Sequence, residues 1–266
     1  MDTKNLLRTI GTLRFNPGRD LLAVLVSCLL VTGTLYTATF IVGAEAAGGM
    51  LYFFLYAIIT AALLGIGFPL YWMVVVRKRP LADLGLTRRN LGIILAIQIV
   101  IAGLQFYAAL RDTAFPAMSQ LLPLAALALA IGFFEAVFWR GWVLLRLEEA
   151  FGLVPALVLG SALYAAYHVG YGMQVSEMVF LFFIGLMFAV VFRMAKSVFI
   201  LWPFFQPMGQ LITLMKESLP LPAIAALGFF EVLIVMFVLV WAAGRIYKKH
   251  HGSPAVHQVR VLQSHP

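Results

Sequence analysis

Apolar runs, most of them about as long as a membrane is thick, restrict the folds that this sequence can adopt. A helix needs about 20 consecutive, mostly apolar residues to cross the hydrocarbon core of a bilayer. Eight runs of roughly this kind follow one another along the chain, at residues 21–42, 50–76, 91–110, 120–147, 154–172, 178–191, 198–215 and 223–243. Pro203 and Pro207 interrupt the seventh run, so it can also be re-entrant rather than fully crossing.

The composition agrees with a membrane protein. Of the 266 residues 63% are hydrophobic and 11% are charged, and the mean hydropathy is +0.98. A soluble domain of this size cannot bury so much apolar surface. The sequence therefore predicts an all-α fold, a polytopic membrane helical bundle with about eight transmembrane helices.

The net charge of +8 is explained by membrane topology, because the basic residues gather between the apolar runs and at the two ends of the chain. Lys and Arg are in excess in residues 1–20, 77–89 and 193–196 and after residue 243, whereas residues 43–49 and 170–177 contain none. Basic loops favour the cytoplasmic side. With eight crossings, both termini are expected in the cytoplasm; a re-entrant seventh run would move the carboxy-terminal tail to the other face. We expect no nucleic-acid partner.

Two ionisable residues in neighbouring apolar runs indicate a functional centre. Glu135 lies in the fourth run and His168 in the fifth, although such groups are costly in lipid and normally face a protein interior or a wet cavity. The two runs form a helical hairpin that turns near residues 151–152, and both residues lie almost equally far from that turn. At about 1.5 Å per residue, the two side chains are predicted at one depth. A histidine alone in a membrane is more often an interhelical hydrogen-bonding residue.

Other polar residues are spaced so that they share helix faces. Tyr164 and His168 are four residues apart, as are Gln206 and Gln210 in the seventh run. Glu135 with His168 could activate a water molecule, and neutral amide donors could stabilise an oxyanion. This is the set of groups that peptide hydrolysis requires.

These residues resemble the CPBP family of intramembrane peptidases, which includes CAAX type II prenyl proteases and the bacteriocin-processing or self-immunity (Abi) proteins. The first family motif, Glu-Glu-x-x-x-Arg, is similar to residues 135–140, which Gly141 follows. The second, Phe-x-x-x-His, is similar to residues 164–168. The third, His-x-x-x-Asn or Asp, is similar to residues 206–210, which follow a Leu-Trp-Pro sequence at 201–203. The resemblance covers about residues 120–212.

The resemblance implies a glutamic-type intramembrane endopeptidase. In that mechanism Glu135 is the general base and His168 holds and polarises the water. Gln206 and Gln210 stand where the family places its oxyanion hole, and Arg140 and Tyr164 are supporting residues. The substrate would be a membrane-associated peptide or protein in the lipid bilayer, and the location the plasma membrane of a prokaryote.

Departures from the family pattern keep two other functions open. Ala136 replaces the second Glu, so Arg140 loses the carboxylate four residues before it, and both polar residues of the third motif are Gln. The chain could therefore be a catalytically degenerate CPBP-like membrane scaffold or immunity protein. It could also be a proton-coupled transporter in which Glu135 and His168 relay protons, although no inverted repeat supports this.

No cofactor is expected, and no metal at the centre. Catalytic zinc takes about three protein ligands, and of the five histidines only His168 lies within an apolar run. The single cysteine, Cys28, is expected to be an inert buried thiol, and Gln98 and Gln105 to form interhelical hydrogen bonds. By function the chain divides into residues 1–119 (a basic lead and three transmembrane helices), 120–215 (the peptidase-like core) and 216–266 (the last transmembrane helix and a basic tail).

Overall fold

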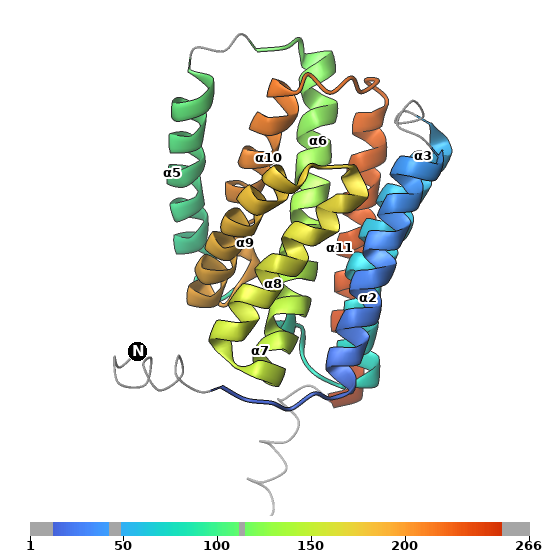
Figure 1. Ribbon diagram of the computed structural model, residues 1–266, viewed down its shortest axis with the longest axis vertical. Helices are drawn as coiled ribbons and strands as arrows, with labels where there is room; N and C mark the ends of the chain where they lie inside the picture. Colours follow the sequence, from blue (N-terminus) through green and yellow to red (C-terminus); the bar gives the residue numbers. More distant parts are fainter. Residues whose placement is uncertain (1–12, 43–48, 112–114, 252–266) are drawn as a thin grey trace, which may run out of the picture.

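The computed structural model describes residues 13–42, 49–111 and 115–251, and the regular structure in these ranges is entirely helical. Figure 1 shows an upright bundle. Most of the predicted basic lead, the predicted loop at 43–48 and the predicted tail after residue 251 lie outside the described residues.

The elements follow the apolar runs closely. Their bounds are α2 (Arg19–Tyr36), η1 (Thr37–Val42), α3 (Met50–Phe53), η3 (Phe54–Gly67), α4 (Phe68–Leu70), η4 (Tyr71–Val76), η5 (Leu81–Leu84), α5 (Leu91–Leu110), α6 (Met118–Glu135), η6 (Ala136–Leu144), α7 (Leu145–Phe151), α8 (Leu153–Tyr167), η7 (His168–Tyr171), α9 (Val175–Ala195), η8 (Val198–Ile200), α10 (Phe205–Lys216) and α11 (Ala225–His251). Several of them join end to end into longer helices.

Within the described ranges, seven helices are long and apolar enough to cross a membrane: Arg19–Val42, Met50–Val76, Leu91–Leu110, Met118–Phe151, Leu153–Tyr171, Val175–Ala195 and Ala225–His251. Only 22–28% of the most apolar stretch of α5, α9 and α11 is buried inside the protein. Such helices are apolar on the sides that face outward as well as inward, which suits contact with lipid. The chain is an integral membrane protein, as predicted.

The proline-interrupted seventh run forms a shorter structure. It begins with η8 and continues, after a turn that contains Pro203, as α10. The 12 residues of α10 extend about 18 Å at 1.5 Å per residue, which is less than the ~30 Å hydrocarbon core. In Figure 1, α10 nevertheless continues toward the end of the bundle where the connection to α11 lies. The segment as a whole therefore links the two ends.

Gln98 on α5 anchors this segment. Its side-chain oxygen accepts hydrogen bonds from the backbone N–H groups of Phe204 (2.9 Å) and Phe205 (3.2 Å), and its amide group donates to the carbonyl oxygens of Phe199 and Trp202. The predicted role of Gln98 in joining helices is confirmed. For Gln105 that role stays a prediction, because its Oε1 has no hydrogen-bond partner in the described part of the chain.

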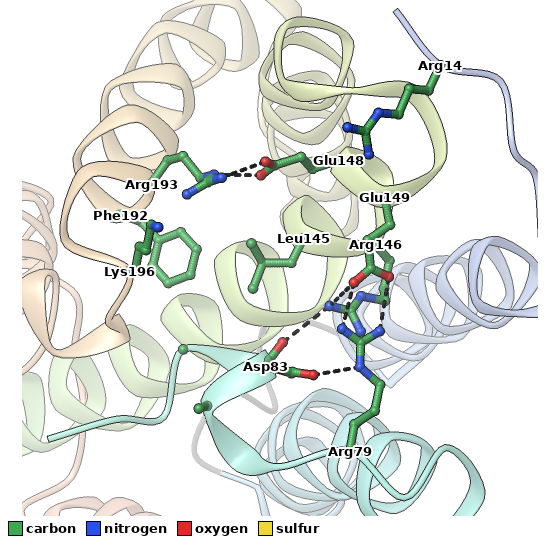
Figure 2. A pocket seen from close by; sticks show the side chains of 12 residues that line it. Arg14, Arg79, Asp83, Leu145, Arg146, Glu148, Glu149, Phe192, Arg193 and Lys196 are labelled. Atoms are coloured by element: carbon green, nitrogen blue, oxygen red, sulfur yellow. Dashed lines mark hydrogen bonds and ion pairs between the residues drawn. The ribbon is translucent and has the colours of Figure 1, made fainter. Parts of the chain in front are cut away.

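The basic loops gather at one end of the bundle, which we call the basic end. Arg79 forms ion pairs with Asp83 (2.6 Å) and with Glu149 on α7 (2.7 Å), and Arg193 on α9 binds Glu148 through two nitrogens at 2.7 Å each (Figure 2). The start of α2 and the last part of α11 lie at this same end (Figure 1). The arrangement fits the predicted placing of both termini on one side, and that this side is the cytoplasm stays a prediction.

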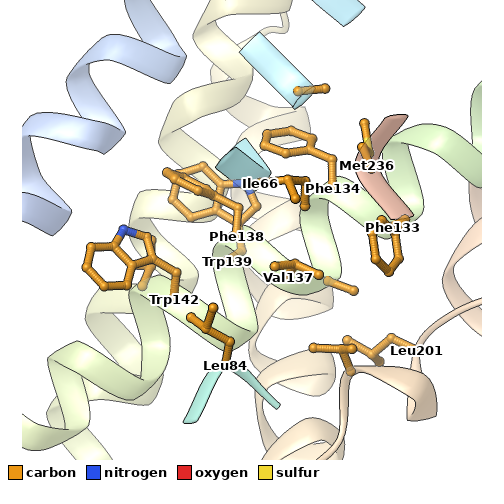
Figure 3. Close-up of a cluster of buried hydrophobic side chains, with 14 of the residues drawn as sticks. Ile66, Leu84, Phe133, Phe134, Val137, Phe138, Trp139, Trp142, Leu201 and Met236 are labelled. Atoms are coloured by element: carbon orange, nitrogen blue, oxygen red, sulfur yellow. The ribbon is translucent and has the colours of Figure 1, made fainter. Parts of the chain in front are cut away.

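The helix formed by α6, η6 and α7 is the centre of the bundle. In its most apolar stretch 72% of the residues are buried, the largest share among the seven candidate spans. Large side chains such as Phe133, Phe138, Trp139 and Trp142 extend from it in several directions (Figure 3). A helix that is apolar all round is expected in the core, and this one carries Glu135 into the middle of the protein.

Candidate functional site

Glu135 is the last residue of α6 and is only 3% exposed. Its Oε2 atom accepts hydrogen bonds from Gln206 Nε2 (2.5 Å), Gln210 Nε2 (3.0 Å) and the Tyr164 hydroxyl (3.3 Å). Its Oε1 atom accepts a hydrogen bond from the Tyr167 hydroxyl. An ionised carboxylate only accepts hydrogen bonds, so four neutral donors around two oxygens suit this group well.

The two glutamines reach Glu135 because α10 begins beside it. Gln206 and Gln210 lie one turn apart on α10, and the turn before this helix is fixed by Gln98 and by a hydrogen bond from Trp202 Nε1 to the carbonyl oxygen of Leu129 on α6 (2.9 Å). Both amide nitrogens point at Glu135. The side-chain oxygens of both glutamines are buried without a hydrogen-bond partner among the described residues.

His168 lies at the junction of α8 and η7 and is 5% exposed. Its Nδ1 atom is 2.8 Å from the backbone carbonyl oxygen of Tyr164, one of the last carbonyls of α8, which lack partners within the helix. A carbonyl can only accept, so Nδ1 carries the proton and donates it. In the neutral ring Nε2 is then the unprotonated nitrogen. The ring packs against Tyr167, with 4.2 Å between ring centroids.

Arg140 is buried (1% exposed) and contacts aromatic rings instead of a carboxylate. Its guanidinium carbon lies 4.4 Å from the ring centre of Tyr164 and 5.8 Å from that of Phe188. A cation over an aromatic face is attracted by the ring quadrupole. In the Glu-Glu-x-x-x-Arg pattern the second Glu would be the carboxylate partner of the Arg. Here that position is Ala136, and aromatic rings are the partners of Arg140.

The helix geometry after Glu135 differs from the α-helix assumed in the sequence analysis. Residues Ala136–Leu144 form a π-helix, η6, in which hydrogen bonds span five residues instead of four. The wider spacing brings residues five apart toward one face. Accordingly Tyr164 contacts both Glu135, through its hydroxyl, and Arg140, through its ring. No ion pair joins Glu135 and Arg140 in the described part of the chain.

The structure thus brings Gln206, Gln210 and Tyr164 into direct contact with Glu135, and the Arg140 guanidinium lies over the Tyr164 ring. His168 lies next to Tyr167 and makes no hydrogen bond to Glu135 within the described residues. Tyr167 is a contact that the sequence analysis missed. Its position three residues after Tyr164 on α8 was a usable signal, because residues three apart share a helix face.

The described residues contain no group of three or more His, Cys, Asp or Glu side chains that could hold a metal ion. The four donors to Glu135 are amides and phenols, whereas zinc sites are built from Cys, His and carboxylate ligands. Cys28 is a free, buried thiol, as predicted.

Comparison with known proteins gives one family match. Residues 117–205 match the family model described as Type II CAAX prenyl endopeptidase Rce1-like, and the resemblance that the motifs indicated is confirmed for this segment. The match includes Glu135, Arg140, Tyr164 and His168 and ends directly before Gln206. No curated protein and no solved structure matches the chain significantly.

Proposed function

We propose, from the similarity of residues 117–205 to type II CAAX prenyl endopeptidases, that this membrane protein is a glutamic-type intramembrane endopeptidase. Glu135 is its general base, and the substrate is a membrane-associated peptide or protein. The observation that carries the proposal is the buried carboxylate of Glu135 with four donors from α8 and α10. The four donors hold both carboxylate oxygens in fixed directions, and a reacting group needs such positioning.

In the proposed reaction, Glu135 removes a proton from a water molecule and the resulting hydroxide attacks the carbonyl carbon of the scissile peptide bond. The C–N bond then breaks, and Glu135 returns the proton to the leaving amine. Water adds its oxygen to the new carboxyl group, so the carboxylate is regenerated and the atoms balance. General acid–base catalysis of this kind contributes about 10²- to 10⁴-fold to the rate.

His168 supports this step through its tautomer. The hydrogen bond from Nδ1 to the Tyr164 carbonyl leaves Nε2 as an acceptor. A water molecule between Nε2 and Glu135 could donate one hydrogen to each of them. In this arrangement the imidazole orients the water, and the carboxylate takes the proton.

The oxyanion is stabilised by the donors that hold Glu135 in the resting state. When Glu135 takes a proton its negative charge disappears, and at the same step negative charge develops on the substrate carbonyl oxygen. The neutral donors then form their hydrogen bonds with the substrate oxygen, because hydrogen bonds to a charged acceptor are stronger. Of the three hydrogen bonds to Oε2, the one from Tyr164 is the longest, at 3.3 Å. Tyr164 is therefore the donor that most easily changes from Glu135 to the substrate oxygen.

The unpartnered side-chain oxygens of Gln206 and Gln210 provide a second reason to expect a peptide here. A buried acceptor without a hydrogen bond costs about 1–3 kcal/mol. Peptide N–H groups are donors that would satisfy both oxygens. The third motif therefore serves to support the base and to bind the substrate backbone as well as to stabilise the oxyanion.

The proposal is tested by comparing the newly formed protein termini in membranes of cells that express the protein, Glu135→Gln or His168→Ala. Glu231→Gln is the matched control, because it removes an exposed carboxylate from α11 outside the site. We expect termini that are present with the wild type and the control but reduced at least about 100-fold with Glu135→Gln. Termini that persist in both site variants would refute the proposal.

A binding function without cleavage is the second candidate, and two observations favour it. Ala136 replaces the second Glu of the family motif, and Glu135 and His168 are both almost fully buried. In that case no terminus would depend on Glu135. Crosslinking from the site to a partner's transmembrane segment would then be retained in Glu135→Gln.

A further inference from the structure

A pocket lies at the basic end of the bundle. It is lined by α7, which follows Glu135 and η6 in the same long helix. Its volume is about 330 Å³, at the lower end of the range typical of ligand pockets. The segment before α2, the loop that contains η5, and helices α7 and α9 all contribute to it (Figure 2). Its charged lining residues are Arg14, Arg79, Asp83, Arg146, Glu148, Glu149, Arg193 and Lys196.

The charges of this lining do not cancel. Five of the charged residues are basic and three are acidic, so the net charge of the lining is +2. All three carboxylates are already paired with Arg79, Arg146 or Arg193. Arg79 donates hydrogen bonds to the carboxylates of Glu149 and Asp83. These bonds, those to Glu149 most of all, raise the pKa of Arg79 above its ordinary value, so its charge is permanent. Arg14 and Lys196 form no ion pair with any residue between 13 and 251 that the structure describes.

Arg146 gives an independent indication of a ligand. It is only 2% exposed, yet its Nε atom has no hydrogen-bond partner among the described residues. Its other two nitrogens are used, one by the sulfur of Met73 and the other by Glu149 (2.9 Å) and the carbonyl oxygen of Asp83 (3.3 Å). A buried guanidinium N–H beside a pocket is an expensive group to leave unpaired, and an anion in the pocket would satisfy it.

We propose that this pocket binds the phosphate group of an anionic phospholipid. Arg146 Nε, Arg14 and Lys196 would bind the phosphate oxygens, since guanidinium and ammonium groups are the usual phosphate partners. Leu145 and Phe192, which also line the pocket, provide an apolar wall for the glycerol and the first part of an acyl chain.

The position of the pocket favours a lipid over a soluble phosphate. Two of the helices that line it, α7 and the end of α9, lie at the basic end of the bundle (Figure 1). This end of the membrane-spanning helices is where lipid headgroups are expected. Basic pockets between transmembrane helices on the cytoplasmic side are known to bind anionic headgroups. A lipid bound here would join four separate segments of the chain, and it would thereby stabilise the folded protein.

The experiment measures the melting temperature of the purified full-length protein in mixed micelles, and lipid retention by native mass spectrometry. Dioleoyl-phosphatidylglycerol, dioleoyl-phosphatidylcholine and inorganic phosphate are compared as additives. For the wild type we expect phosphatidylglycerol to raise the melting temperature by about 2–4 °C, and one phosphatidylglycerol molecule to be retained. Equal stabilisation by phosphatidylcholine would overturn the proposal, and equal stabilisation by inorganic phosphate would overturn the assignment to a lipid.

The double variant Arg14→Gln/Lys196→Gln tests the location of the site. Both side chains are exposed and form no described ion pair, so the fold should tolerate their loss; Arg14→Glu alone is a second variant with the same expectation. Lys248→Gln/Lys249→Gln is the control, because it removes the same charge from exposed positions in the last turns of α11. We expect the effect of phosphatidylglycerol to be lost in the pocket variants and kept in the control. An effect that persists in the pocket variants, or disappears equally in the control, would show general attraction to the charged membrane end and overturn the proposal.

Discussion

The side chain of Glu135 is held from two directions. The phenols come from α8 and the amides from α10, and their contacts divide between the two carboxylate oxygens. A carboxylate constrained in this way keeps one orientation, which the proposed reaction requires while water and substrate bind. Such orientation is worth more to a reaction than the energy of any single hydrogen bond, because misplacement of a reacting group by about 1 Å can cost 10²-fold in rate.

Tyr167 should matter for activity even though the family pattern does not include it. Tyr167→Phe removes the donor to Oε1 and leaves the ring packing against Trp139 and His168 in place. A hydrogen bond to a charged group contributes about 1.5–3 kcal/mol, so we expect kcat to fall at least about 10-fold. Tyr71→Phe, at an exposed position, is the control. Unchanged cleavage in Tyr167→Phe would show that Oε1 needs no donor.

Gln206 and Gln210 should differ in importance. Gln206 is buried and donates to Glu135 at 2.5 Å, whereas Gln210 is partly exposed and donates at 3.0 Å. We therefore predict that Gln206→Leu lowers kcat by about 10- to 100-fold and Gln210→Leu by less. Cleavage assays on both variants, together with their melting temperatures, separate loss of chemistry from loss of folding. A larger effect of Gln210→Leu would contradict this order.

At this scale, most of the residues that contact Glu135 were already candidates from the sequence, and the reason for what was missed is geometric. Glu135, Gln206, Gln210 and Tyr164 were found because polar residues in apolar runs are conspicuous. The direction of the amide groups could not be predicted, because it depends on how the turn before α10 packs against α5 and α6. Tyr167 was overlooked because a tyrosine is also an ordinary core residue.

The most unusual element is η6, the π-helical part of the central helix. Its close packing against a neighbouring loop requires a glycine at position 141. A Cβ atom at Gly141 would collide with the backbone carbonyl group of Leu84, in the loop between the second and third spans. This close approach lets the loop lie directly on the helix that carries Glu135. The loop is held there further by Val198, whose backbone N–H donates to the carbonyl oxygen of Gly85 (3.0 Å).

Gly141→Ala should therefore destabilise the protein. The new methyl group meets backbone atoms that cannot rotate away, and overpacking of this kind costs about 1–3 kcal/mol. Gly103→Ala on α5 is the matched control, because nothing lies within 4 Å of its added Cβ and alanine is the better helix former by about 1 kcal/mol. We expect a lower melting temperature for Gly141→Ala and an equal or higher one for Gly103→Ala. Equal values for Gly141→Ala and the wild type would show that the loop moves freely.

The extents of the helices were largely predictable, whereas their internal geometry was not. Runs of apolar residues define spans because the bilayer requires about 20 of them. The same runs do not distinguish an α-helix from a π-helix, because both are fully hydrogen-bonded inside the segment. For this reason the sequence located the helix that carries Glu135 and Arg140 but did not predict its π-helical part.

On the scale of the whole molecule, the bundle has two ends with different chemistry. Ion pairs at the basic end join the loop before η5, the α7–α8 hairpin and α9. The placing of these loops at one end was predictable from the distribution of Lys and Arg. The pairing of individual charges was not, because it depends on how far each helix extends beyond its neighbours.

The pair formed by Arg193 and Glu148 should contribute measurably to the stability of the bundle. The side chains are 27% and 17% exposed, and two nitrogens of Arg193 bind the two oxygens of Glu148. In a double-mutant cycle with Arg193→Gln and Glu148→Gln, we expect a coupling energy of about 0.5–1 kcal/mol. Melting temperatures in detergent at low and high salt provide the measurement. A coupling energy near zero at low salt would show that α7 and α9 are held together by their apolar contacts alone.

The most direct test of the account is hydrolysis by the purified, reconstituted protein in water enriched in ¹⁸O. The test uses a membrane-anchored peptide chosen from the termini that depend on the wild type, and it follows the mass of the new carboxyl terminus. We predict one ¹⁸O atom per cleaved bond with the wild type and with Glu231→Gln, and no product above background with Glu135→Gln. Cleavage that continues at the wild-type rate in Glu135→Gln would contradict the assignment of Glu135 as the base that activates water.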